Sequence, residues 1–196
     1  VGSEMCIRDS DISEYDDIST KDQYQVAIDA GCSREEALRC CYENSRDNAR
    51  TPMQWTDDEN AGFTDGTPWL AMNPNYRQIN VREQEVRTDS VLAYYRRLVH
   101  LRKADAYRET FTYGIFEPAY QEMADVFAYY RVSGESGQRI LVAANFGTDA
   151  VSLPLAYPCR QVLLSNLRAE SAVETACEKA NALTLESCEV AVIELG

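Results

Sequence analysis

Apolar residues follow a helical period near the middle of the chain. Between Asp89 and Lys103 they recur at intervals of three and four, with the stem of one arginine continuing the row: Val91, Leu92, Tyr95, Leu98, Val99 and Arg102. This spacing places them on one face of an amphipathic helix. Thr88 or Asp89 is the expected N-cap of that helix.

Two shorter helices are predicted before it. The stretch STKDQYQVAIDAG, residues 19–31, predicts a helix with Ser19 or Thr20 as its cap and Gly31 as its end. Residues 33–44, SREEALRCCYEN, begin with Ser33 and place Glu36 three positions later. That spacing is a capping box, in which each side chain satisfies the other residue's backbone N–H.

Residues 45–87 have neither period. Three prolines and two glycines interrupt them, which predicts an irregular loop. A connection of this length is unusual in a compact domain and indicates either function or disorder. Four aromatic residues that could anchor such a loop argue against disorder: Trp55, Phe63, Trp69 and Tyr76.

Beyond residue 106 the apolar period becomes two, which predicts short strands separated by turns. The predicted strands are TFTYGIF (110–116), DVFAYYR (125–131), QRILVAANF (138–146), AVSLPL (150–155), CRQVLLSN (159–166), NALTLES (181–187) and EVAVIEL (189–195). Strands at this spacing are typical of an antiparallel β-sandwich. The fold class is therefore α+β. A helix-and-loop half, too small to close its own core, is followed by an all-β half.

Charge and composition narrow the classes of partner. The 196 residues carry a net charge of −13 and no basic stripe, so neither nucleic acid nor an anionic membrane is an expected partner. A neutral sugar or a peptide fits this charge. No apolar window of about 18 residues predicts a membrane span. Seven cysteines without a CxxC motif indicate free thiols in a reducing compartment, so a cytoplasmic location is expected.

The titratable residues predict no metal site and no cofactor. His100 is the single histidine and lies within the helical pattern, so a surface or half-buried structural role is expected for it. The acid pairs Asp16-Asp17 and Asp57-Asp58 could be read as catalytic carboxylates, which in a retaining glycosidase lie about 5–5.5 Å apart across a pocket. Adjacent acids in a polar stretch more often point apart into solvent, and that interpretation is preferred here.

The stretch SRDNARTPMQW, residues 45–55, carries the strongest candidate chemistry. Arg46 and Arg50 are four residues apart, so on one helical turn they would share a face. Pro52 ends any such turn at Thr51. The two guanidinium groups could bind a carboxylate bidentately, or could only tie the loop to neighbouring acids.

Trp55 and Trp69 leave a similar choice open. An exposed indole can stack on the apolar face of a sugar ring, whereas a buried one anchors the loop that carries it. Tryptophans in such a loop more often anchor it, so the anchoring role is the preferred interpretation for both.

Three motifs in this order resemble the closing part of family 13 glycoside hydrolases. They are SRDNARTPMQW (45–55), ENAGFTDGTPWLAMNPNYRQINV (59–81) and DSVLAYYRRLVHLRK (89–103), and DISEYDDIST (11–20) is similar to the segment before them. The similarity is to the branch of oligo-1,6-glucosidases, α-glucosidases, dextran glucosidases and trehalose-6-phosphate hydrolases. It covers residues 11–105 strongly and the β half in character only.

The resemblance implies a fold for each segment. Residues 11–105 would be the end of a (β/α)8 barrel, with 11–87 as the long loop after its last strand and 89–103 as its last helix. Residues 106–196 would be an antiparallel β-sandwich C-terminal domain. Residues 1–10, VGSEMCIRDS, have no period and look like translated adaptor sequence, so they are expected to lie outside the fold.

The resemblance also implies a function. It indicates a retaining α-glucosidase that hydrolyses short α-1,6- or α-1,4-linked glucosides, with an oligosaccharide substrate. In the family an arginine of the SRDNARTPMQW motif pairs with a carboxylate lining the glucose subsite, so Arg46 and Arg50 are both substrate-binding candidates. The family's catalytic carboxylates and calcium loop have no counterpart here. No catalytic residue is therefore assigned, and this stretch alone is expected to be inactive.

Two alternatives remain at this point. One is a glucosyl-transferring relative of the sucrose isomerase type, although Met53 stands where those enzymes carry phenylalanine, which favours a hydrolase. The other is a non-catalytic β-sandwich module that binds carbohydrate or another protein.

Overall fold

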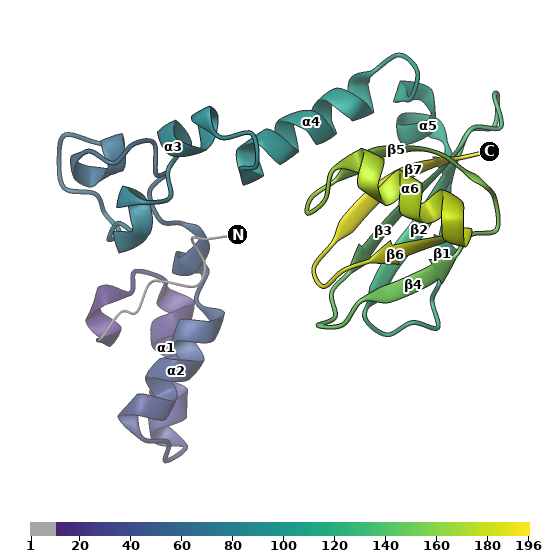
Figure 1. Ribbon diagram of the computed structural model, residues 1–196. Coiled ribbons are helices and arrows are strands. Elements are labelled where there is room, and N and C mark those ends of the chain that lie inside the picture. Colours follow the sequence, from purple (N-terminus) through teal and green to yellow (C-terminus); the bar gives the residue numbers. More distant parts are fainter. Residues whose placement is uncertain (1–10) are drawn as a thin grey trace. The chain divides into compact units, whose positions relative to one another are not determined.

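The computed structural model describes residues 11–196, apart from the side chains at positions 43, 48, 176 and 178–180. Segment 1–10, expected to lie outside the fold, is not among the described residues. The chain divides into two compact units, Val1–Ala93 and Tyr94–Gly196, and Figure 1 labels their elements.

The first unit opens with a short 3-10 turn, η1 (Ile12–Glu14), and a pair of packed helices, α1 (Ile18–Asp29) and α2 (Arg34–Asn44) (Figure 1). The predicted cap of α1 is wrong. Asp17, not Ser19 or Thr20, caps the helix, because its carboxylate accepts a hydrogen bond from the Ser19 amide. The capping box of Ser33 and Glu36 at the start of α2 is confirmed.

Residues 45–87 are largely irregular, as predicted, with three 3-10 turns, η2 (Arg46–Ala49), η3 (Glu59–Gly62) and η4 (Pro74–Arg77). One short helix within them, α3 (Val81–Val86), was not predicted. Asn80 starts it by accepting a hydrogen bond from the Glu83 amide at 2.9 Å. In the sequence this cap is marked only by two polar residues, Asn80 and Glu83, three positions apart.

Helix α4 (Val91–Lys103) confirms the central amphipathic helix. Its start differs from the prediction, because the Ser90 hydroxyl accepts a hydrogen bond from the Ala93 amide, so neither Thr88 nor Asp89 is the cap. The buried side of the helix also differs. The residues that pack on the sheet of the second unit are Tyr94, Leu98 and Leu101. Of these, only Leu98 belongs to the predicted apolar row. Val91, Tyr95 and Val99 are 51%, 58% and 47% exposed.

The first predicted strand, residues 110–116, is wrong in its first half. Residues Arg108–Tyr113 form a helix, α5, and the strand β1 covers Ile115–Ala119. Gly114 joins them at a point where a side chain would collide with the carbonyl oxygens of Thr110 and Val132. The β-branched and aromatic composition of this segment favours a strand, but Phe111 packs against the sheet from the helix.

All strand pairs in the second unit are antiparallel. One sheet has five strands in the order β1-β2-β3-β7-β5, and the other pairs β4 with β6. The six strands after β1 agree with the predicted ones within one or two residues: β2 (Val126–Val132), β3 (Arg139–Asn145), β4 (Val151–Pro154), β5 (Cys159–Ser165), β6 (Ala182–Leu185) and β7 (Val190–Leu195).

A helix that was not predicted, α6 (Glu170–Ala180), interrupts the all-β half. It packs against β5 and β6, and Figure 1 shows it alongside β5. Together with the β4–β6 pair it covers one face of the large sheet. The sandwich prediction is thus correct for the antiparallel strands, while one of the two layers is partly helical.

Both faces of the sheet are covered because β3 and β7 carry nearly continuous apolar residues, so successive side chains on opposite faces are both apolar. Leu141 and Ile193 point into a core shared with α6 and the β4–β6 pair. Ile140 and Val192, on the opposite face, pack against α4 and the Tyr107–Phe111 segment. Central strands buried on both faces carry almost no polar position, which is the pattern of these two strands.

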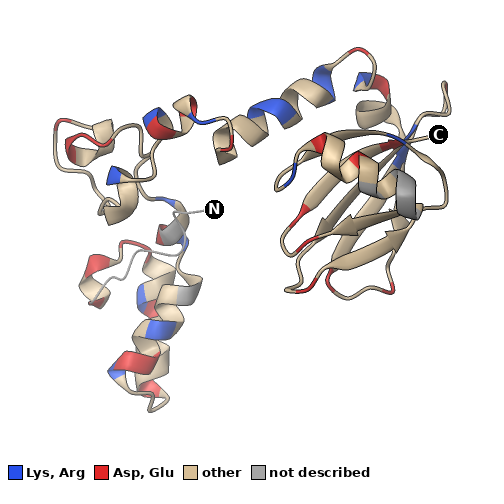
Figure 2. Cartoon of the chain, viewed as in Figure 1, with Lys and Arg blue, Asp and Glu red and all other residues tan. Residues whose placement is uncertain are grey.

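Charged residues are distributed unevenly over the elements. Figure 2 shows acidic positions scattered over both units, while basic positions recur along α4. In the described part of the chain no helix has the length and apolar character needed to cross a bilayer.

Candidate functional site

The segment with the two candidate arginines follows α2 directly. Ser45 ends α2, where its amide donates to the Cys41 carbonyl at 2.8 Å. The Ser45 hydroxyl then accepts from the Asp47 amide at 3.2 Å and so caps η2. One buried serine therefore fixes both the end of the helix and the start of the turn that carries Arg46.

Arg46 is bound to Asp17. Its Nη2 lies 2.5 Å from Asp17 Oδ1 and its Nε 3.2 Å from Oδ2, a bidentate pair. Asp17 is only 5% exposed, and Thr20 Oγ1 also donates to it at 3.1 Å. These hydrogen bonds, above all the one from Arg46, hold the pKa of Asp17 well below its ordinary value.

The expectation that Asp16 and Asp17 point apart into solvent is therefore wrong for Asp17. The residue caps α1 and binds an arginine 29 positions later in the chain. Because the Asp17 carboxylate is bound by the helix cap and by Arg46, the pair Asp16-Asp17 is not a catalytic dyad.

Asp47, the acid between the two arginines, is a second link to the start of the chain. Its Oδ2 accepts hydrogen bonds from the Asp16 and Asp17 amides at 2.7 and 2.8 Å. The residue is 4% exposed, and its Oδ1 has no hydrogen-bond partner within the described part of the chain. That oxygen lies 3.8 Å from Arg50 Nη1.

Arg50 is held much less firmly than Arg46. Its side chain is 43% exposed, and 3.8 Å to Asp47 is too long for a hydrogen bond. The predicted shared face does not form, because α2 ends at Asn44 and the arginines lie in and after a 3-10 turn. Residues four apart in such a turn are rotated by about 120°. Each guanidinium therefore faces a different acid.

The loop after Arg50 is held by backbone and amide hydrogen bonds. The Trp55 and Thr56 amides donate to the Ala61 carbonyl at 2.9 and 3.0 Å, and the Gln54 side chain donates to Asn75 Oδ1 at 2.9 Å. Ala61 itself has a φ of +53°, a conformation that costs energy in a residue with a Cβ.

Three of the four expected aromatic anchors do not hold this loop within the described structure, whereas the fourth, Tyr76, is half-buried. The Trp55 and Trp69 side chains are 48% and 65% exposed, and Phe63 is 46% exposed. Of the two roles considered for the tryptophans, burial as an anchor is absent among the described residues. The rings are open to a ligand or to another segment.

The second acid pair lies at the surface, as expected, but its two carboxylates bind the same arginine. Arg82 bridges it, with Nη1 2.9 Å from Asp57 Oδ1 and Nη2 2.9 Å from Asp58 Oδ2. Hydrogen bonds from Thr56 and then from Arg82 lower the pKa of Asp58. All three charged groups are more than half exposed, so this cluster is a surface ion-pair network that ties two loop segments together.

His100 is exposed on α4, in line with the surface role expected for it. Among residues 11–196, no three or more His, Cys, Asp or Glu residues are grouped so that they could hold a metal ion. The six cysteines outside segment 1–10 are free thiols.

Sequence reasoning identified both arginines but missed the acids that distinguish them. The available signals were weak. Asp17 precedes a helical pattern, where an aspartate is a favoured cap, and Asp47 lies between two arginines in RDNAR. Neither signal tells which arginine each carboxylate contacts.

The ionised state of Asp17 predicts a pH dependence of stability. Because its pKa in the folded chain is depressed below the ordinary 3.8, its contribution is complete above pH 3.8 and is lost as the pH falls through the depressed value. Asp17→Asn is expected to lower the free energy of unfolding at neutral pH. The difference from wild type should shrink below pH 3.8.

Urea unfolding at several pH values and constant ionic strength measures this difference in the free energy of unfolding. The exposed Asp22→Asn on α1 is the matched control and should change stability little at any pH. A deficit of Asp17→Asn that stays constant from neutral to acidic pH would contradict the assignment.

Comparison with known proteins identifies the family. Residues 2–114, more than half of the chain, match the family model described as alpha amylase, catalytic domain. The oligo-1,6-glucosidase of Bacillus cereus is 40% identical over 144 residues, which are 73% of this chain and 25% of that protein. The oligo-1,6-glucosidase of Parageobacillus thermoglucosidasius is 36% identical over 173 residues, 86% of this chain and 30% of that protein.

Comparison with solved structures supports the same family. Isomaltulose synthase from Klebsiella sp. LX3 superposes with a TM-score of 0.83 at 32% identity, over 100% of this chain and 34% of that one. Trehalose-6-phosphate hydrolase from Bacillus licheniformis gives 0.81 at 30%, over 98% and 34%. The chain belongs to the alpha-amylase family. It spans between a quarter and about a third of the length of these relatives, and its fold fits part of a barrel followed by a β-rich domain.

Proposed function

We propose that these 196 residues belong to a longer retaining α-glucosidase that hydrolyses short α-1,6- or α-1,4-linked glucosides. The observation that carries the proposal is the 40% identity to an oligo-1,6-glucosidase over 73% of this chain. The glucan 1,6-alpha-glucosidase of Streptococcus pneumoniae, 36% identical over 83% of this chain, supports the same linkage class. The family match over residues 2–114 favours an enzyme over an isolated β module.

The proposed places of the segments in the barrel follow the resemblance. Residues 11–87 are the long loop after the last barrel strand, 89–103 are the last helix, and 106–196 are the C-terminal β domain. The apolar row Val91, Tyr95 and Val99, spaced by four and about half exposed, supports a helix with a second packing partner. Loops at this end of barrel strands build the active site in such folds, which supports the proposal that SRDNARTPMQW lies beside the substrate.

Of the two arginines, Arg50 is the proposed substrate-side residue. Two N–H groups of Arg46 are already bound to a buried carboxylate, so Arg46 positions the turn. The Arg50 guanidinium is exposed and lies 3.8 Å from a buried oxygen that lacks a hydrogen-bond partner among the described residues. It is therefore free to bind a carboxylate that lines the glucose subsite, as the family motif implies.

The test is to express the longer protein and to assay its products. Glucose released from isomaltose, with the α-anomer appearing first by NMR, is the expected result for a retaining enzyme. Conversion of sucrose to an isomer without glucose release from isomaltose would replace the hydrolase by the transferring alternative. Absence of any activity on α-glucosides would overturn the proposal.

A further inference from the structure

One side of the large sheet carries a group of exposed aromatic rings in the second unit. Phe116 of β1 and Phe127 of β2 are 49% and 56% exposed. Both rings contact the half-buried Tyr129, with centroids 4.8 Å and 5.7 Å away. These three residues form the aromatic face, which spans β1 and β2, neighbours in the sheet (Figure 1).

The strand register places the aromatic face on the side of the sheet that α4 partly covers. Tyr129 is paired with Val142 of β3, and the side chains of directly paired residues lie on the same side of a sheet. Val142 packs against the core cluster that lies under α4 and Phe111. The same side is therefore buried over β3 and β7 and largely open over β1 and β2.

The aromatic face carries no acid, although the chain has 32 acidic residues. On this side of β1 and β2 the register gives Phe116, Pro118, Phe127, Tyr129 and Arg131, so the arginine is the single charged position among them. Aromatic residues and arginine are enriched in protein interfaces, whereas acids are depleted there. An exposed apolar patch of this kind indicates a surface that binds another polypeptide segment.

Arg131, at the edge of the aromatic face, has a buried N–H group without a partner. Its Nη2 donates to the Phe111 carbonyl at 3.3 Å. Its Nε is buried and has no hydrogen-bond partner among the described residues. Buried polar atoms in folded proteins are nearly always paired, so an acceptor on a further segment would account for this one.

We propose that the aromatic face binds the part of the alpha-amylase catalytic domain that lies outside these 196 residues. The chain spans between a quarter and about a third of the length of its relatives, so most of their length has no counterpart in it. The match to the catalytic domain covers residues 2–114. That range includes α4 and Phe111, which already cover this side of the sheet. Further residues of the same domain would continue that contact over β1 and β2.

The proposal rests on the longer protein proposed above, but not on its activity. Two other occupants fit the aromatic face less well. A second copy would bring together two chains that each carry a net charge of −13, and their repulsion opposes association. A sugar needs several polar groups around it and an open ring face. Phe127 and Tyr129 meet edge to face, with 62° between their planes, so they form no flat platform.

The experiment measures how fast hydroxyl radicals oxidise each ring in the longer protein, by mass spectrometry of its peptides. Tyr157 is the internal reference, because it stacks on Arg139, which also lies over Tyr130 on the opposite side of the sheet. In these 196 residues Phe127 is more exposed than Tyr157, 56% against 39%. In the longer protein we expect Phe127 to be oxidised at least about 5-fold more slowly than Tyr157, because the core of an interface is fully buried.

Phe127→Arg in the longer protein gives a second measurement. A charge placed in the contact should expel the neighbouring segment and raise the oxidation rate of Tyr129 at least about 5-fold, while Tyr157 keeps its rate. Leu167→Arg is the matched control, because Leu167 is 55% exposed and lies outside the aromatic face. It should leave the oxidation rate of Tyr129 unchanged.

Oxidation of Phe127 as fast as that of Tyr157 in the longer protein would overturn the proposal. Protection that disappears on dilution would overturn it as well, because the occupant would then be a second copy. Protection that appears only when isomaltotriose is added would replace the protein segment by a sugar. None of these measurements depends on hydrolysis, so a failure of the proposed α-glucosidase activity is seen separately, in the glucose assay.

Discussion

Arg50→Ala in the longer enzyme is expected to lower kcat/KM for isomaltose by about 100-fold or more, equivalent to about 2.7 kcal/mol of transition-state stabilisation. The reason is that its guanidinium is exposed and loosely held in this chain. It is therefore available to a carboxylate at the glucose subsite, and removing one partner of such a pair costs about 2–5 kcal/mol. Steady-state kinetics on the purified variant measure this.

Arg46→Ala should act differently. Asp17 would lose both hydrogen bonds from the guanidinium and would remain as a buried, unpaired carboxylate. The expected effect is a lower thermal midpoint, with activity per folded molecule changed less than in Arg50→Ala. Thermal unfolding and active-site titration separate the two quantities.

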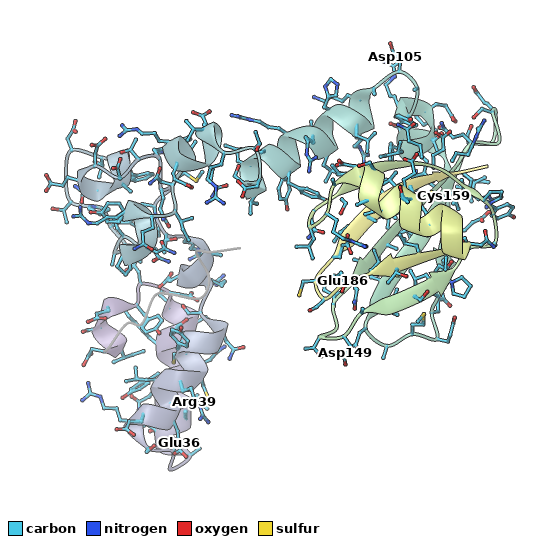
Figure 3. The ribbon with its side chains drawn as sticks, in the orientation of Figure 1. Glu36, Arg39, Asp105, Asp149, Cys159 and Glu186 are labelled. Carbon is cyan, nitrogen blue, oxygen red and sulfur yellow. The ribbon has the colours of Figure 1, made fainter. Side chains whose placement is uncertain are left out.

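Matched variants keep this prediction testable. Arg50→Lys retains the charge but lacks the planar fork that binds a carboxylate bidentately, so its activity should lie between wild type and Arg50→Ala. Arg39→Ala removes an exposed arginine on α2 (Figure 3) and should leave kcat/KM unchanged. An active Arg50→Ala enzyme, or an Arg46→Ala enzyme that folds normally and loses activity, would reverse the assignment.

Arg168→Met is expected to destabilise the second unit by about 3–5 kcal/mol. Arg168 Nε and Nη2 lie 2.9 and 2.8 Å from the two carboxylate oxygens of Glu189, a residue with no exposed surface. Burial alone would raise the pKa of Glu189, but the hydrogen bonds, chiefly those from Arg168, hold it below its ordinary value. The methionine leaves that carboxylate buried without its cation.

Thermal unfolding of the wild type and the variant measures the loss, which corresponds to more than about 10 °C in a unit of this size. Arg160→Met is the control. Arg160 is 66% exposed and lies 3.9 Å from Glu194, so its loss should cost about 1 kcal/mol or less.

A double variant tests the cause. Combining Arg168→Met with Glu189→Leu removes both charges, and we expect it to recover at least about half of the lost stability. Recovery should be incomplete because the Ser165 hydroxyl and the Glu186 amide also donate to Glu189. If the double variant is no more stable than Arg168→Met, the loss does not come from the unpaired carboxylate.

The sequence predicted the elements whose signals are local. The strands β2 to β7 were visible because alternating or continuous apolar runs are bounded by turn residues, and Ser33 with Glu36 marked the start of α2. The helix α6 was missed although Val173 and Cys177 are four residues apart, because the surrounding strands suggested an all-β half. The helix α5 was missed because its threonines and aromatics favour strands, while Phe111 packs from a helix, half-buried, against the sheet.

The sequence alone determined the family motif, the acidic charge and the two arginines that could act on a sugar-binding carboxylate. Only the tertiary structure decided that Arg46 binds Asp17 and that Arg50 stays exposed beside Asp47. Asp17 and Arg46 are 29 residues apart, and no periodic pattern connects them. The contact forms because α1 and α2 fold back on each other, and a carboxylate buried by that packing needs a cation at hydrogen-bond distance.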